Sequence, residues 1–144
     1  MKARISRDKT VEDWRYIAAK TGGGGDPKLW SAIYKDFFVD RIESRYFAPI
    51  TLIRDNDLSC GEGFSIVAIQ CSLIEFLEST YQGKSYRYVR NGDRRLGPHE
   101  YGGSKDIFVS FLTNRKPFGE YFDRDSAIEF YSSVRCGLLH EAAT

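Results

Sequence analysis

The sequence predicts an all-α fold, a bundle of about five helices with a long loop at residues 83–103. In several segments the apolar residues recur at the 3.6-residue spacing of an amphipathic helix. Residues that favour helix starts and ends, such as Thr10 and Pro27, bound these segments. No segment shows the strict alternation of apolar and polar residues that is typical of a half-buried strand. A helical bundle is therefore the expected class.

Two helices are expected in the first third of the chain. The first covers residues 11–20, with Thr10 as its N-cap. The second begins at the N-cap Asp26 and is expected to end near Tyr46, because Pro49 lacks the amide hydrogen that a regular helix needs. The residues that follow Pro49 are interpreted as a connection.

Three further helices are expected in the rest of the chain. The most apolar of them covers residues 62–81. A shorter helix is expected from the capping residue Ser104 to about Asn114. The last begins near Asp123 or Asp125 and continues to the C-terminus.

Length and composition indicate a single domain that spans residues 1–144. Hydrophobic residues make up 42% and charged residues 28%, which is ordinary globular composition. A chain of this length buries enough surface to fold without disulfides or a structural metal. The apolar runs are too short to span a bilayer, and the N-terminus lacks the apolar stretch of a secretory signal. A cytoplasmic location is therefore expected.

Charge, cysteine and histidine content exclude several kinds of function. The net charge is +1, so any contact with nucleic acid has to come from a local patch. Cys60, Cys71 and Cys136 form no CxxC pair, which argues against a disulfide framework and a thiolate zinc site. His99 and His140 are the only histidines, and no carboxylate lies at ligand spacing from them. No metal site and no other cofactor is therefore expected.

Arg135 and His140 carry the most specific chemistry in the chain. A histidine accepts or donates a proton near neutral pH, and an arginine holds a phosphate and stabilises charge developing on it. The pair suits cleavage of an RNA phosphodiester by its own 2′-hydroxyl. At about 100° per residue, the two positions lie about 140° apart around an ideal helix. Convergence therefore requires a bent helix or a second copy, and on spacing alone the pair is more often two surface residues.

The run from Phe130 to Glu141 resembles the Arg-x4-6-His motif of HEPN domains (higher eukaryotes and prokaryotes nucleotide-binding). The segment from Ile66 to Glu78 is similar to the long family helix that packs against the motif helix, so the resemblance covers roughly Glu62 to the end. It implies a helical bundle in which two copies form one site. It also implies metal-independent endoribonuclease activity of the kind used in toxin–antitoxin, CRISPR and anti-phage systems.

The resemblance assigns roles to individual residues. Arg135 and His140 match the two family positions, so that His140 would be the general acid or base and Arg135 would neutralise the scissile phosphate. Glu75 is expected either to hydrogen-bond Arg135 or to be a solvated surface acid. Glu141 is expected to be a surface acid at the helix end, or to orient His140 in a dimer. A polar residue usually follows the arginine in the family, and Cys136 stands there instead.

The loop at residues 83–103 is a predicted RNA-binding segment. It carries five basic residues against Asp93 and Glu100, and tyrosines are interleaved with them. Basic and aromatic side chains together suit phosphate attraction and base stacking on single-stranded nucleic acid. The alternative is a solvated loop whose charges have no partner. The basic residues are Lys84, Arg87, Arg90, Arg94 and Arg95.

The sequence thus favours a HEPN endoribonuclease that forms a homodimer through the helix carrying Arg135 and His140. Its expected setting is defence, a toxin–antitoxin pair or stress, with RNA as substrate and an antitoxin or other regulatory protein as partner. Cys136 and the chain end soon after His140 motivate an alternative, a non-catalytic HEPN module that binds RNA, nucleotide or a partner protein. A sequence cut short at its C-terminus would also explain that end. A plain helical interaction domain is a third reading.

Overall fold

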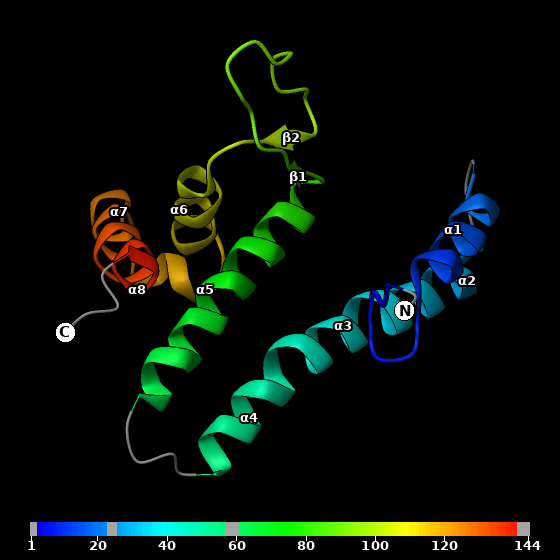
Figure 1. Cartoon of the computed structure of the whole chain (residues 1–144), viewed down its shortest axis with the longest axis horizontal. Coiled ribbons are helices and arrows are strands. Elements are labelled where there is room, and N and C mark those ends of the chain that lie inside the picture. The colour runs from blue at the N-terminus through cyan, green and yellow to red at the C-terminus, as the bar shows by residue number, and fades with distance from the viewer. Residues whose placement is uncertain (1–2, 23–25, 57–60, 141–144) are drawn as a thin grey trace. The chain divides into compact units, whose positions relative to one another are not determined.

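The computed structural model describes residues 3–22, 26–56 and 61–140 of the chain (Figure 1). The side chains of the last two described residues, Leu139 and His140, are not placed. The contacts divide the chain into two compact units, Met1–Glu62 and Gly63–Thr144, and the single domain expected from the sequence stays a prediction. Each unit is described by itself.

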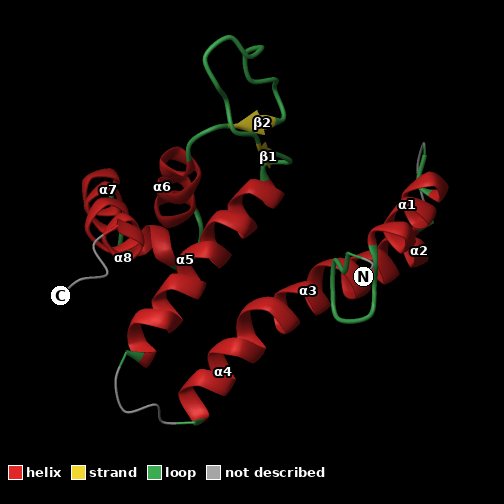
Figure 2. Cartoon of the chain, in the orientation of Figure 1, coloured by secondary structure: helices red, strands yellow, loops and turns green. Residues whose placement is uncertain are grey.

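Most of the described residues are helical, which confirms the predicted helical class (Figure 2). The only strands in the described ranges are two short ones inside the predicted long loop. None of the helices in the described part of the chain combines the length and the apolar character needed to cross a bilayer.

The first unit begins with two helices whose starts agree with the sequence. The helix α1 (Val11–Lys20) has the N-cap Thr10, whose side chain forms a capping box with Asp13. The helix α2 (Pro27–Ile33) follows the N-cap Asp26, whose carboxylate accepts a hydrogen bond from a backbone amide of the first turn.

The second predicted helix does not end near Tyr46, and the predicted connection after Pro49 is wrong. The amide of Ala48 donates to the carbonyl of Glu43, five residues earlier, as in a wide π-helical turn. Pro49 therefore falls in the first turn of a new α-helical segment, where its missing amide hydrogen costs little. The consecutive segments are a π-turn at Tyr34–Val39, α3 (Asp40–Ile42), a π-turn at Glu43–Phe47 and α4 (Ala48–Asp55).

The second unit contains the helices that carry the predicted site residues. The long helix has the predicted bounds, and the last one begins at the N-cap Asp123, whose carboxylate and Ser126 form a capping box. A π-helical turn interrupts the last helix. The segments are α5 (Glu62–Tyr81), α6 (Ser104–Asn114), α7 (Arg124–Phe130), a π-turn at Tyr131–Cys136 and α8 (Gly137–His140).

Ser104 does not cap α6 as the sequence predicts, because Gly103 holds the N-cap position. The Ser104 hydroxyl instead lies 2.8 Å from the hydroxyl of Tyr131, at the start of the π-turn. After α6 the chain turns so tightly that a Cβ on Gly119 would lie 2.6 Å from the carbonyl oxygen of Thr113. The contact of Ser104 with Tyr131 connects α6 to the helix that carries Arg135.

The hydrophobic core of the second unit is built around α6. Phe108 is fully buried, and its ring lies 6.2 Å from that of Phe130 and 5.6 Å from that of Tyr131. The aromatic contacts hold the π-turn against α6. The buried members of the core are Cys71, Phe108, Val109, Phe111, Leu112 and Ala127.

A buried ion pair holds α5 to the end of α6. The Glu78 side chain is fully buried, and Arg115 donates to its two oxygens at 2.7 and 2.9 Å. Gln82 and Ser110 donate to the same carboxylate at 2.7 and 2.8 Å. Burial by itself raises the pKa of the Glu78 carboxyl, but these hydrogen bonds outweigh it, so that the pKa lies below its usual value. This network was not predictable from the sequence, since its partners Glu78 and Arg115 are 37 residues apart in the chain.

Candidate functional site

Arg135 and Glu75 meet between the π-turn and α5. Arg135 Nη2 donates to Glu75 Oε2 at 3.4 Å, so the predicted hydrogen bond is present. Both side chains are about one-fifth exposed, at 22% and 21%. The guanidinium carbon of Arg135 also lies 5.5 Å from the ring centroid of Tyr131, one turn earlier. The arginine is therefore oriented by an acid on one neighbouring helix and by an aromatic ring on its own.

Tyr101 is a second partner of Glu75. Its hydroxyl donates to Glu75 Oε1 at 3.2 Å, so each carboxylate oxygen accepts one hydrogen bond. Burial, together with the negative charge of Glu75, raises the pKa of Tyr101. Tyr101 consequently remains a protonated donor. Glu75 thus connects the base of the loop at 83–103 to Arg135.

A small open cavity lies beside this pair, with a volume of about 280 Å³ including the solvent-facing part. Residues of α5 line it on one side and residues of the last helix on the other, and each side contributes one member of the ion pair. Burial raises the pKa of the Cys71 thiol, although the charge of Arg135 opposes the shift. A protonated thiol is a poor nucleophile, so Cys71 serves here as packing. The lining residues are Ala68, Cys71, Ser72, Glu75, Arg135 and Leu138.

The π-turn includes Arg135 and stops before His140. It ends at Cys136, and the backbone of Gly137–His140 is α-helical. A Cβ added to Gly137 would meet no described atom within 4 Å. The helix is therefore open at this position, which leaves room for a second chain or a ligand.

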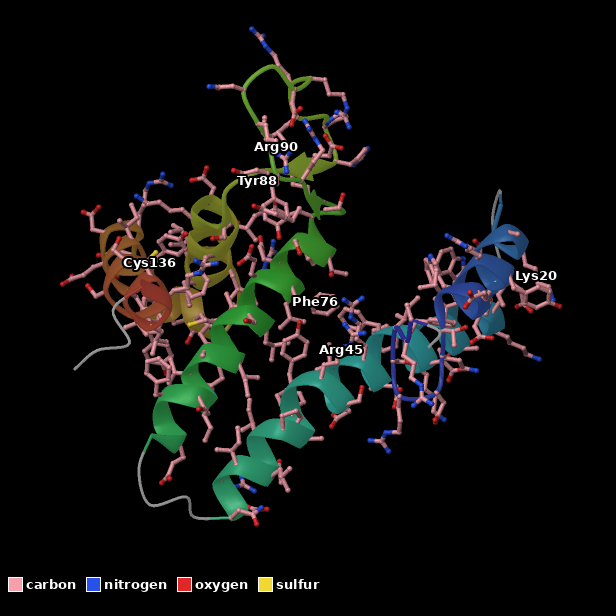
Figure 3. The ribbon with its side chains drawn as sticks, in the orientation of Figure 1. Lys20, Arg45, Phe76, Tyr88, Arg90 and Cys136 are labelled. Atoms are coloured by element: carbon pink, nitrogen blue, oxygen red, sulfur yellow. The ribbon has the colours of Figure 1, made fainter. Side chains whose placement is uncertain are left out.

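The remaining motif residues are only partly described. His140 is the last residue of α8, its side chain is not placed, and Glu141 lies outside the described residues. Cys136 is a half-buried free thiol at the end of the π-turn, next to α8 in Figure 3. Of the predicted motif residues, the structure brings together Arg135 and Glu75.

The predicted loop at residues 83–103 extends from the C-terminal end of α5 and is closed by a short parallel ladder (Figure 1). The strand β1 (Ser85–Tyr86) pairs with β2 (Glu100–Tyr101). The amide of Ser85 donates to the carbonyl of His99, and that of Arg87 to the carbonyl of Tyr101, both at 2.9 Å. The two ends of the loop therefore meet, as in a compact Ω-loop.

Glu100 organises two of the five basic residues predicted to bind RNA. Its carboxylate accepts from Arg94 at 2.6 and 2.9 Å, from Arg87 at 3.0 Å and from the amide of Gly97 at 2.9 Å. The hydrogen bond from Arg94, followed by that from Gly97, lowers the pKa of Glu100 to about 2. Lys84, Arg90 and Arg95 form no ion pair with any described residue.

Sequence reasoning missed the roles of Glu100 and Tyr101. Glu100 was expected only to balance charge, and the available signal for such a cluster was its position among five basic residues. Tyr101 carried no signal, because its contact with Glu75 joins residues 26 apart in the chain.

The Arg135 site has the chemistry of an anion-binding site. An arginine carries five N–H donors, and among the described acceptors its side chain hydrogen-bonds only to Glu75. The other donors can hold a phosphate oxygen. In the described ranges, no three histidine, cysteine or acidic side chains gather where they could hold a metal ion. Among known proteins, no family model, no curated protein and no solved structure matches the chain.

Proposed function

We propose that this protein is a metal-independent endoribonuclease of the HEPN kind, in which Arg135 binds the scissile phosphate and His140 transfers protons. One observation carries the proposal. The arginine of an Arg-x4-His motif is held by Glu75 beside an open cavity, with most of its N–H donors facing no described acceptor. Oriented donors of this kind stabilise the charge that develops on a phosphate in the transition state.

The reaction follows from the chemistry of RNA. The 2′-oxygen attacks the adjacent phosphorus as its proton passes to a base, and the bond from phosphorus to the 5′-oxygen breaks. That oxygen takes up a proton, and the products end in a 2′,3′-cyclic phosphate and a 5′-hydroxyl. A histidine is suited to either proton transfer near neutral pH, which is the role assigned to His140.

The working site requires two copies of the chain. On an ideal α-helix the positions of Arg135 and His140 lie about 140° apart, which favours a site that two chains complete together. A second copy that packs at the open Gly137 position would bring the His140 of one chain toward the Arg135 of the other. This arrangement accounts for both the spacing and the glycine.

The test is cleavage of end-labelled single-stranded RNA by the purified chain in the presence of EDTA. We expect His140→Ala to abolish cleavage and His99→Ala, at the only other histidine, to leave it unchanged. DNA of the same sequence should not be cut, because it lacks the attacking hydroxyl. Cleavage by His140→Ala at the wild-type rate would refute the assignment.

The second candidate is a HEPN module that binds RNA, nucleotide or a partner protein without cutting. It is favoured by Cys136, a half-buried thiol at the position where the family usually has a polar residue. A thiol is a weak hydrogen-bonding group and orients a histidine poorly. RNA binding by wild type that depends on Arg135, without any turnover at high protein concentration, would select this candidate.

A further inference from the structure

The loop at residues 83–103 has a fixed internal structure. The β1–β2 ladder closes it, and Tyr101 fastens its base to Glu75 in α5. Inside it, a Cβ on Gly102 would lie 3.3 Å from Leu96 and 3.7 Å from Val89, so these side chains cover the glycine. A loop that packs against itself in this way holds its exposed side chains in defined positions.

The charges of this loop fall into two groups. Arg87 and Arg94 converge on Glu100 inside the cluster, with their donors directed at its carboxylate. Arg90 and Arg95 are exposed, and neither guanidinium has an acidic partner among the described residues. Figure 3 shows nitrogen-bearing side chains that project from the outer edge of the loop. Arg87 and Arg94 are therefore paired with Glu100, although the Arg94 side chain is 65% exposed. The exposed cations without an acidic partner among the described residues are Arg90 and Arg95.

The same loop also carries an exposed aromatic ring. Tyr88 is 67% exposed, and its ring makes no aromatic contact with a described residue. Tyr86, two residues earlier, is in contact with Tyr101, at 5.6 Å between ring centroids. Of these two tyrosines, Tyr88 is thus the one whose ring has no aromatic neighbour among the described residues and is free for stacking. It lies two residues before Arg90 (Figure 3).

We propose that this loop is a preformed platform for single-stranded RNA, in which Arg90 and Arg95 contact phosphates, Tyr88 stacks on a base and Glu100 fixes the geometry. A duplex offers no unstacked base to Tyr88, whereas a single strand offers both bases and phosphates. Single-stranded RNA would then be the substrate class of the proposed ribonuclease, and in this respect the inference rests on the proposed function. Binding to the loop itself is measurable without cleavage.

The experiment is equilibrium binding, by fluorescence anisotropy, of a labelled 2′-O-methyl RNA of about 12 nucleotides, a length suited to one small platform. The methyl group blocks attack by the 2′-oxygen, so no cleavage interferes. Tyr88→Ala should weaken binding at least about fivefold, which is the low end of base–aromatic stacking. The matched control is Tyr121→Ala, at a tyrosine that is 78% exposed elsewhere in the same unit. We expect this control to bind as wild type does.

The salt dependence separates the two kinds of contact. Each phosphate contact to a single strand contributes about 0.7 to the slope of log affinity against log salt concentration. The double variant Arg90→Ala/Arg95→Ala should reduce this slope by about 1.4, while Tyr88→Ala should leave it unchanged. Arg124→Ala, at an exposed arginine at the start of α7, is the control and should leave the slope at its wild-type value.

Glu100→Gln distinguishes a preformed platform from a loosely basic loop. The substitution removes a negative charge, so simple electrostatics predicts tighter binding. The platform predicts binding weaker by about fivefold or more, because Arg87 and Arg94 lose their anchor and the loop must be ordered on binding. Tighter binding by Glu100→Gln, or wild-type affinity of the Tyr88 and Arg90/Arg95 variants, would overturn the proposal.

The platform and the ribonuclease can fail separately. If the wild-type protein binds RNA through the loop but does not cut it, the platform is supported and the proposed ribonuclease function is refuted. If cleavage depends on His140 but the loop variants change neither RNA binding nor the cleavage rate, the ribonuclease is supported and the platform is refuted.

Discussion

The Arg135 guanidinium donates to the carboxylate of Glu75, a residue 60 positions earlier in the chain, at 3.4 Å. This single contact orients the arginine without occupying its other donors. The opposite oxygen of Glu75 accepts from Tyr101 at the base of the loop. Glu75 therefore lies between the proposed RNA platform and the proposed phosphate-binding residue.

Glu75 is expected to act as a positioning residue for Arg135. Glu75→Ala should lower the single-turnover cleavage rate by about tenfold to a hundredfold, because small misplacements of a reacting group have effects of that size. Glu75→Gln should retain more activity, since its amide oxygen still accepts from Arg135. Glu129→Ala, an exposed acid on α7, is the control. Wild-type rates in Glu75→Ala would show that the contact has no part in the reaction.

Gly137 tests the interface between copies. Gly137→Ala should raise the free energy of unfolding of the monomer by up to about 1 kcal/mol, because the new methyl group meets no described atom. The same methyl group should weaken the dimer and the cleavage that depends on it. Sedimentation velocity and urea unfolding measure the two effects. Gly63→Ala, a helical and equally open glycine in α5, should leave the dimer unchanged, and a Gly137→Ala dimer of wild-type affinity would contradict the interface.

The Glu78–Arg115 pair is expected to be a major determinant of stability. Glu78→Gln should lower the free energy of unfolding by about 3 kcal/mol, the lower end for breaking a buried pair, because the partly exposed Arg115 regains water. Urea denaturation checks this, with Glu129→Gln as an exposed acid for comparison. Equal stability of the two variants would show that the buried network contributes little.

The loop cluster predicts a defined dependence of stability on pH. The pKa of Glu100 is about 2 when folded, against 4.5 for an ordinary glutamate. A depressed pKa stabilises the folded state above the unfolded pKa, and this contribution is lost as the pH falls from about 4.5 through about 2. The difference in unfolding free energy between wild type and Glu100→Gln should be constant above about pH 5 and shrink below it. A difference that does not change with pH would contradict the cluster.

Local features of the fold were predictable from the sequence because they depend on neighbouring residues. The capping residues Thr10, Asp26 and Asp123 and the bounds of α5 follow from side chains a few positions apart. The helix past Pro49 was not predictable in this way. A wide turn ahead of the proline shifts the hydrogen-bonding pattern, and no local preference for such a turn is visible in the sequence.

The candidate site was predictable only in part, because its contacts join distant segments. For Glu75 the sequence left two alternatives open, a hydrogen bond to Arg135 or a solvated surface acid, and the structure shows the hydrogen bond. The contact of Tyr101 with Glu75 and the inward turn of Arg87 depend on how the loop closes. The composition of the loop at residues 83–103 showed an excess of positive charge, but it did not show which basic side chains lack an acidic partner.

The most direct test of the central claim is the single-turnover cleavage of end-labelled RNA by Arg135→Ala and Arg124→Ala, with identification of the product ends. Loss of an oriented donor to the transition-state phosphate should slow Arg135→Ala by about a hundredfold or more. The exposed arginine variant should cut at the wild-type rate and leave 2′,3′-cyclic phosphate ends. Wild-type cleavage by Arg135→Ala, or products with other ends, would contradict the account.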